Sequence, residues 1–119
     1  MNQDRAYICR LIDIYGNVLS ERQRDVVDLY YNEDLSLAEI AEHTGLSRQG
    51  VRYAIKHAEE SLINYEEKLG LSKKTEVLQE NLLEAEKIVK LLKANHPNES
   101  NEFDRLLSLI ISAGSIMKE

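Results

Sequence analysis

The side chains best suited to chemistry in this sequence are three cations spaced four residues apart. Arg48, Arg52 and Lys56 form a single stripe if the segment is an α-helix. Gln49 and Tyr53 form the adjoining stripe, and no acidic residue interrupts the segment. Arginine pairs with guanine and glutamine with adenine through two hydrogen bonds in a DNA major groove, whereas lysine reaches phosphate. These residue types predict a nucleic-acid contact surface.

A basic stripe on a helix is also typical of an ordinary solvated face. The charge of the chain favours this simpler interpretation, because 15 Lys and Arg stand against 21 Asp and Glu. Residues 1–70 alone hold eight basic and thirteen acidic residues. Dedicated DNA-binding domains are commonly basic. Tight duplex binding would therefore need the acidic side chains to point away from the groove, or a dimer that presents two helices.

Enzymatic chemistry is not expected from this sequence. Cys9 and His57 could in principle form a nucleophile and its base, but a single cysteine on a helix is more often a small core residue. His43, His57 and His96 share no metal-ligand spacing, and no glycine-rich phosphate-binding loop is present. We therefore expect no catalytic residue, no metal site and no bound cofactor. The single cysteine also excludes an intrachain disulfide.

The helix that carries the basic stripe has a clear predicted start and end. Ser47 is a helix-capping residue, and no helix breaker follows it until Gly70. The preceding helix is expected to begin after Ser36, because Glu39 completes an S-x-x-E capping box with it. That helix should end at Gly45. The sequence thus predicts two helices joined by a short turn.

Residues 37–56, LAEIAEHTGLSRQGVRYAIK, match the helix-turn-helix pattern of DNA-binding proteins. Ala41 is small where two helices cross closely, and Gly45 allows the positive φ that the turn requires. Val51 packs the second helix onto the first. The small core is completed by Ile40, Leu46 and Ile55. We therefore expect the helix after Ser47 to be the recognition helix.

Two more helices are predicted before this motif. One apolar face at helical spacing comprises Ile8, Leu11, Ile12 and Tyr15. After a break at Gly16, Ser20 is expected to cap the next helix, with Gln23 returning the cap. The predicted buried face of that helix comprises Val26, Leu29 and Tyr30. Tyr30 and Tyr31 are expected to cover an edge of the core.

Residues 71–119 predict a helical hairpin after the domain formed by residues 1–70. Ser72 is the expected cap, and Pro97 favours a turn between the two helices. The apolar seam of the first helix comprises Leu78, Leu82, Ala85, Val89 and Leu92, and the face of the second comprises Phe103, Leu106, Leu107, Ile110 and Ile111. Two helices cannot bury both stripes against each other alone. We expect a homodimer, with folding back onto residues 1–70 as the alternative.

The composition agrees with an all-α protein of the cytoplasm. Five glycines and one proline are few for a β-sandwich, and the hydrophobic share of 43% is ordinary for a folded chain. No apolar run has the length of a membrane helix, so we expect no membrane insertion. The first twenty residues carry several charges where a signal peptide would need an apolar core.

Residues 19–68 resemble region 4 of bacterial sigma factors, and more closely the YlxM family of small helix-turn-helix proteins. The resemblance is carried by residues 19–23, by YYNED at 30–34, by SLAEIAE at 36–42 and by SRQGVRYAIK at 47–56. Beyond Gly70 only the length and the helical character match. The resemblance implies a sigma region 4-like or winged-helix-like DNA-binding superfold, followed by an αα-hairpin. The chain lacks the promoter-melting and core-polymerase parts of a complete sigma factor.

The resemblance also implies a bacterial regulatory or accessory protein. Genes of this family commonly neighbour those of the signal recognition particle, so the expected partners are DNA, the RNA of that particle and its GTPases. The expected nucleic-acid-binding residues are Ser47, Arg48, Gln49, Arg52, Tyr53 and Lys56. The alternative is a protein-interaction adaptor that uses the same scaffold without nucleic acid. Many such motifs carry alanine where this chain has Gly50, which lowers helix stability by about 1 kcal/mol.

Overall fold

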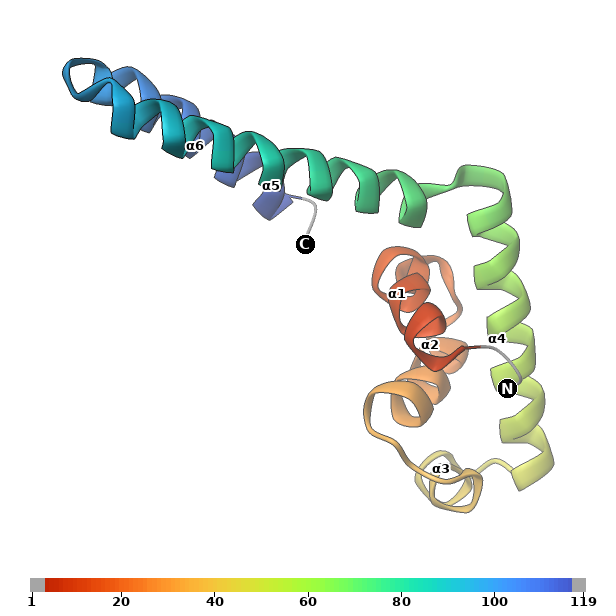
Figure 1. Cartoon of the computed structure of the whole chain (residues 1–119). Helices are drawn as coiled ribbons and strands as arrows, with labels where there is room; N and C mark the ends of the chain where they lie inside the picture. Colours follow the sequence, from red (N-terminus) through yellow and green to blue (C-terminus); the bar gives the residue numbers. More distant parts are fainter. Residues whose placement is uncertain (1–3, 117–119) are drawn as a thin grey trace. The chain divides into compact units, whose positions relative to one another are not determined.

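Every regular element is helical in residues 4–116, the part of the chain that the computed structural model describes. The predicted all-α fold is therefore confirmed. The helices are α1 (Arg5–Tyr15), α2 (Glu21–Val27), α3 (Leu37–Thr44), α4 (Arg48–Leu69), α5 (Leu71–Asn95) and α6 (Ser100–Ile116) (Figure 1). Short 3-10 turns at Gly16–Val18 and Pro97–Glu99 and a π-helical turn at Asp28–Asn32 join some of them. The chain forms two compact units, Met1–Ser72 and Lys73–Glu119.

The long helix α4 organises the first unit, because α1, α2 and α3 all pack against it (Figure 1). Its inner face consists of buried residues at helical spacing, namely Val51, Ile55, Ala58 and Leu62. The facing residues of the other three helices include Ile8, Leu11, Ile12, Val26, Val27 and Ile40, all fully buried. Each such side chain contributes about 1.5–3 kcal/mol by leaving water. The predicted apolar face of α1 is thus confirmed.

The caps predicted at Ser20, Ser36 and Ser47 are present with the expected geometry. Ser20 and Gln23 form a complete capping box at α2, and Ser36 and Glu39 form another at α3. The hydroxyl of Ser47 accepts a hydrogen bond from the first turn of α4. Each cap satisfies backbone N–H groups that have no partner within the helix. These caps fix where the two helices of the helix-turn-helix motif begin.

Gly45 makes the turn of the motif, as predicted. Its φ of 78° is left-handed, and its N–H donates to the carbonyl of Ala41. Residues with a Cβ rarely adopt this conformation, whereas glycine adopts it without steric strain. A chain without this turn could not bring the start of α4 back beside α3.

The end of α2 differs from the predicted pattern. Val27 and Tyr31 are buried with Val26, whereas Leu29 and Tyr30 are only partly buried. The prediction for Leu29 and Tyr30 was wrong because α2 continues into a π-helical turn. Glu33 N–H there donates to the carbonyl five residues earlier, so each turn holds more residues than an α-helical turn.

Tyr31 and Glu59 form a buried polar pair between this π-helical turn and α4. The phenol of Tyr31 donates a hydrogen bond to the carboxylate of Glu59, which is only 4% exposed. A buried carboxylate is unfavourable unless hydrogen bonds compensate for lost water. The pair therefore fixes the register of the π-helical turn against α4.

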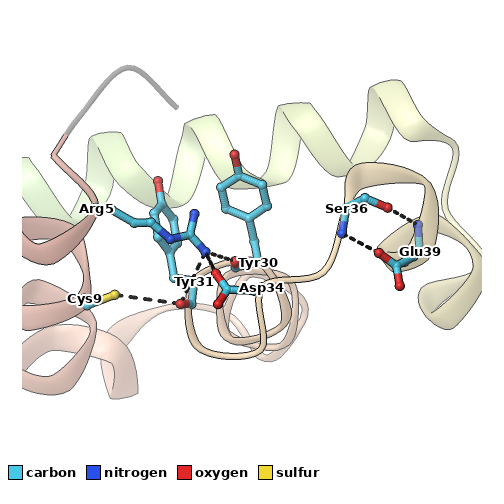
Figure 2. A network of polar contacts seen from close by, with 7 residues as sticks. All are labelled: Arg5, Cys9, Tyr30, Tyr31, Asp34, Ser36 and Glu39. Carbon is cyan, nitrogen blue, oxygen red and sulfur yellow. Dashed lines mark hydrogen bonds and ion pairs between the residues drawn. The ribbon is translucent and has the colours of Figure 1, made fainter.

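Arg5 holds the outer side of the same turn (Figure 2). Its guanidinium donates to the carbonyl of Tyr30 and to the carboxylate of Asp34. It also lies 5.1 Å from the ring centroids of both Tyr30 and Tyr31, within the range of cation–π attraction. Asp34 has a positive φ of 55°, and its contact with Arg5 supports this uncommon conformation. Arg5 thus connects the first turn of α1 to the π-helical turn and to Asp34, which follows it.

The junction between α4 and α5 corrects one prediction. Helix α5 begins at Leu71 after a left-handed Gly70, so Ser72 lies inside its first turn and is not its cap. The N–H of Ser72 instead donates to the carboxylate of Glu66, which also accepts the hydroxyl of Tyr15. A carboxylate in α4 therefore does the work of a capping residue at the start of α5.

The second unit contains the predicted hairpin, and its apolar stripes are only partly buried, as expected for two helices that pack on each other alone. Lys93 and Asp104 form an ion pair of 2.5 Å on either side of the turn. Val89 is buried, whereas Leu78 and Leu92 of the predicted seam remain 48% and 41% exposed. On α6, Leu106 and Ile111 of the predicted face are also largely exposed. Two helices touch along one narrow line, so stripes wider than that line are left uncovered.

Replacing Gly45 with valine is expected to reduce the free energy of unfolding by about 1–3 kcal/mol, because a β-branched residue is strained at positive φ. A Cβ at this position would meet no atom within 4 Å, so the effect comes from the backbone and not from a clash. Gly45→Asn should lose much less, since asparagine tolerates this conformation. Denaturant unfolding of the three proteins measures the difference. Equal stabilities of the valine and asparagine variants would contradict the turn geometry.

Stability is expected to fall at alkaline pH because of Tyr31. Burial, together with the hydrogen bond to Glu59, raises the pKa of Tyr31 above its ordinary value of 10.0. The unfolded phenol loses its proton at about pH 10. The folded phenol keeps its proton, so its contribution to stability is complete below that pH and is lost as the pH rises above it.

The test is the free energy of unfolding measured between pH 8 and pH 11 for the wild type and two variants. Tyr31→Phe should be less stable at neutral pH but should lose less stability on going alkaline. Tyr53→Phe is the matched control, because Tyr53 is 64% exposed and should leave the pH profile unchanged. Identical pH profiles for Tyr31→Phe and the wild type would refute this role of Tyr31.

Candidate nucleic-acid interface

The first half of α4 presents the predicted site residues on its outer face. The inner face of the helix is held by the core, so positions between the buried residues must face away from it. All six predicted residues are exposed, namely Ser47, Arg48, Gln49, Arg52, Tyr53 and Lys56. The structure therefore brings them together over the first turns of one helix.

The cations of this face are not neutralised locally. Within residues 4–116, Arg48, Arg52 and Lys56 have no ion-pair partner. The first acidic residue of α4 is Glu59, and its carboxylate is turned inward to Tyr31. The first exposed carboxylate of the helix is therefore that of Glu60. The positive charge remains available to an anionic ligand along about 12 Å of helix, from Arg48 to Lys56.

A shallow hollow of about 490 Å³ lies where the starts of α3 and α4 meet. It is lined by Leu37, Arg48, Gln49 and Arg52. Leu37 is half-buried against the core and also contributes an apolar wall to this hollow. One feature of the sequence indicates this partial exposure, namely the position of Leu37 directly after the cap of α3. The hollow combines an apolar wall with groups that hydrogen-bond to bases.

Tyr53 and His57 form a pair of rings beside the basic stripe. Their centroids lie 4.2 Å apart with a 45° tilt, as expected for neighbours one turn apart on a helix. Both side chains are exposed. His57 was predicted to be a plain surface residue, and its contact with Tyr53 adds a flat, partly apolar surface to the outer face of α4. Such a surface is suited to stacking on a base or a sugar.

The start of the recognition helix depends on Ser47 and Gly50. The N–H of Gly50 donates to the hydroxyl of Ser47 at 3.0 Å. A Cβ at position 50 would lie 3.1 Å from that hydroxyl oxygen, closer than most side chains allow. The glycine therefore leaves room for the cap. This steric effect is separate from the low helix propensity of glycine, which was predicted from the sequence and lowers helix stability.

The preceding helix α3 carries exposed acidic side chains. Glu39 and Glu42 are exposed, and Glu39 accepts a hydrogen bond from the N–H of Ser36 (Figure 2). This hydrogen bond lowers the pKa of Glu39, so its carboxylate keeps its negative charge to lower pH than an ordinary glutamate.

Cys9 and His57, the two residues considered as a nucleophile and its base, contact different parts of the first unit. Cys9 is half-buried, with its sulfur 3.9 Å from the carbonyl of Tyr31 (Figure 2). His57, in contrast, is exposed and contacts Tyr53. Within the described residues, no group of three or more His, Cys, Asp or Glu is arranged to hold a metal ion. Among the helices described, none combines the length and the apolar character that crossing a membrane requires.

A known protein family matches most of this chain, including the helix-turn-helix motif. Residues 2–104 match the model of family UPF0122, described as "Putative helix-turn-helix protein, YlxM / p13 like". The matched segment includes the whole of α1 to α5 and the start of α6. The similarity therefore extends into the hairpin that follows the motif.

Individual relatives support this match over most of their length. A UPF0122 protein of Clostridium kluyveri is 52% identical over 79 residues, which cover 66% of this chain and 71% of the relative. A UPF0122 protein of Desulforamulus reducens is 46% identical over 92 residues, covering 77% and 76%. One of Clostridium novyi is 39% identical over 107 residues, covering 88% and 90%.

Ser47→Ala is expected to destabilise the start of α4 by about 1 kcal/mol, because the N–H of Gly50 loses its acceptor. Hydrogen exchange at the Gly50 amide should then be about fivefold faster, the factor that corresponds to this free energy. Ser108→Ala is the matched control, because Ser108 is exposed in the middle of α6. An unchanged exchange rate at Gly50 would show that the cap does not hold the helix start.

Proposed function

Because the chain belongs to the UPF0122 family of helix-turn-helix proteins, we propose that it is a regulatory or accessory protein that binds nucleic acid through α4. One observation carries this proposal. The outer face of the second helix of the motif presents Arg48, Arg52 and Lys56 with no ion-pair partner among the described residues. The core holds this face rigidly, so binding requires no reordering of the helix.

Each side chain of the face has a role that follows from its chemistry. Gln49 and Arg52 are the base-reading groups, since each can form two hydrogen bonds with a base edge. Arg48 and Lys56 lie one turn to either side of Arg52 and would contact phosphates. Tyr53 would pack against a sugar or a base.

The two indications of the ligand point in different directions. An α-helix fits the major groove of B-form DNA, whereas the deep and narrow major groove of A-form RNA excludes it. The resemblance to YlxM proteins, in contrast, favours the signal recognition particle and its RNA. We propose duplex DNA or a widened, irregular RNA helix as the ligand, with the pathway of the signal recognition particle as the setting.

A specific observation also favours a second function, that of a protein-interaction adaptor. Glu39 and Glu42 stay exposed on α3, the other helix of the motif, and the first 70 residues carry more acidic than basic groups. Such a mixed surface suits a protein partner with both charges, including a GTPase of the signal recognition particle. In this case α4 would dock on the partner and not in a groove.

Fluorescence anisotropy with labelled signal recognition particle RNA and with mixed-sequence duplex DNA tests the first function. Arg52→Glu is expected to weaken binding by about tenfold or more, because it replaces a base-reading cation with an anion. Lys68→Glu is the matched control, since Lys68 is exposed near the other end of α4 and changes the net charge equally. With three cations contacting phosphate or bases, the logarithm of the affinity should fall with the logarithm of salt with a slope of at most about −3.

The outcomes separate the two functions. Binding that weakens with salt and is lost only in Arg52→Glu supports the nucleic-acid function, and the tighter ligand identifies the kind of nucleic acid. Equal losses in Arg52→Glu and Lys68→Glu would indicate attraction without a defined site. An absence of binding to either ligand at low salt would overturn the nucleic-acid function and leave the adaptor function as the one to test.

A further inference from the structure

The second unit has very little core of its own. Among residues 73–116, Val89 is the one large apolar side chain that is buried, whereas Leu83, Leu91 and Leu109 are more than half exposed. Helical units of this size generally need a disulfide, a metal ion or another subunit to be stable. The single cysteine lies in α1, and no metal-binding cluster occurs in the described residues. The exposed apolar side chains therefore call for a covering surface.

Leu109 and five other exposed apolar side chains follow one stripe on each helix. The stripe of α5 comprises Lys74, Leu78, Asn81, Ala85, Ile88 and Leu92, and that of α6 comprises Glu102, Leu106, Leu109, Ala113 and Ile116. Both have alternating gaps of four and three residues, which is the spacing of helices that pack lengthwise against other helices. We call the two stripes together the stripe face.

Both stripes lie on the same side of the hairpin. A groove of about 350 Å³ between α5 and α6 marks the other side, and Leu83 and Ile111 line it. Successive residues of an α-helix are about 100° apart, so Leu83 lies opposite Asn81, and Ile111 lies opposite Leu109. Since the groove side of each helix is fixed in this way, both stripes face the side away from the groove. The stripe face is therefore one continuous surface.

The charges of the stripe face are placed only at its two ends. Lys74 lies at the open end of the hairpin, and Glu102 lies near the turn, whereas the stripe residues between them are uncharged. Two copies joined by a two-fold axis, with their turns pointing in opposite directions, would bring Lys74 of each copy to Glu102 of the other. The surface is thus complementary to itself in charge as well as in apolar character.

We propose that the stripe face binds the stripe face of a second copy of this chain, so that two hairpins form an antiparallel four-helix bundle. Ala85 lies near the middle of the α5 stripe and Ala113 lies one position before the end of the α6 stripe, and such small side chains allow helices to approach closely. The pairing covers the exposed apolar residues of the stripe face in both copies, namely Leu78, Ile88, Leu92, Leu106, Leu109 and Ile116. It stands independently of the nucleic-acid function, because none of its residues lies in α4.

Sedimentation equilibrium of the full chain tests the pairing. The wild type is expected to have twice the chain mass of 13.7 kDa at micromolar concentration. Leu109→Glu should raise the dimer dissociation constant by about a hundredfold or more, because the symmetry places the buried charge in the interface twice. Leu83→Glu is the matched control, since Leu83 is exposed to a similar extent but faces the groove. Circular dichroism checks that both variants remain helical.

A charge exchange tests the orientation without placing any charge in the apolar surface. Lys74→Glu and Glu102→Lys should each weaken the dimer, because each brings two like charges together, and the double variant should restore the wild-type affinity. A monomeric wild type would overturn the proposal. Loss of the dimer in Leu83→Glu but not in Leu109→Glu would also overturn it, as would single charge variants with wild-type affinity and no restoration in the double variant.

Discussion

The whole of the candidate interface depends on the burial of one face of α4. Val51, Ile55 and Leu62 are fully buried against α1, α2 and α3. Since each such side chain contributes about 1.5–3 kcal/mol, rotation of α4 about its axis would be very unfavourable. The core therefore fixes the direction in which Arg48 and Arg52 point, and these two side chains need no contacts that hold them in place. A helix held in this way presents the same side chains to every ligand, which is what selective recognition requires.

A buried carboxylate in the same helix is the main exception to this apolar rule. Glu59 would be unfavourable in the core without compensation, and Tyr31 supplies it from the π-helical turn. That turn is itself unusual, and Arg5 holds it from outside through backbone carbonyls and Asp34. The consequence for the surface is indirect but important. With Glu59 turned inward, the acidic charge nearest the basic stripe is removed from the outer face of α4.

Features that depend on neighbouring residues were predictable from the sequence, and features that depend on distant contacts were not. The caps at Ser36 and Ser47 and the turn at Gly45 are local, and each is present as predicted. The burial of Tyr31 depends on a π-helical turn and on a carboxylate 28 residues away. The cap of α5 likewise comes from Glu66 and not from Ser72. In the hairpin the spacing of leucines predicted helices correctly, but spacing alone does not tell which residues the partner helix covers.

The acidic character of the first unit has a consequence for how such a protein would act. Three cations can neutralise only a few phosphates, and the surrounding carboxylates oppose any contact outside the stripe. Non-specific attraction to nucleic acid should therefore be weak for one copy, and only a well-fitted site would hold it. Two copies joined through their hairpins would contribute two such faces to one ligand, provided that the ligand spans both. Binding would then depend on the protein concentration as well as on the sequence of the ligand, because dimerisation and recognition become linked equilibria. In such a system the hairpin would set the affinity without touching the ligand, whereas α4 would set the specificity.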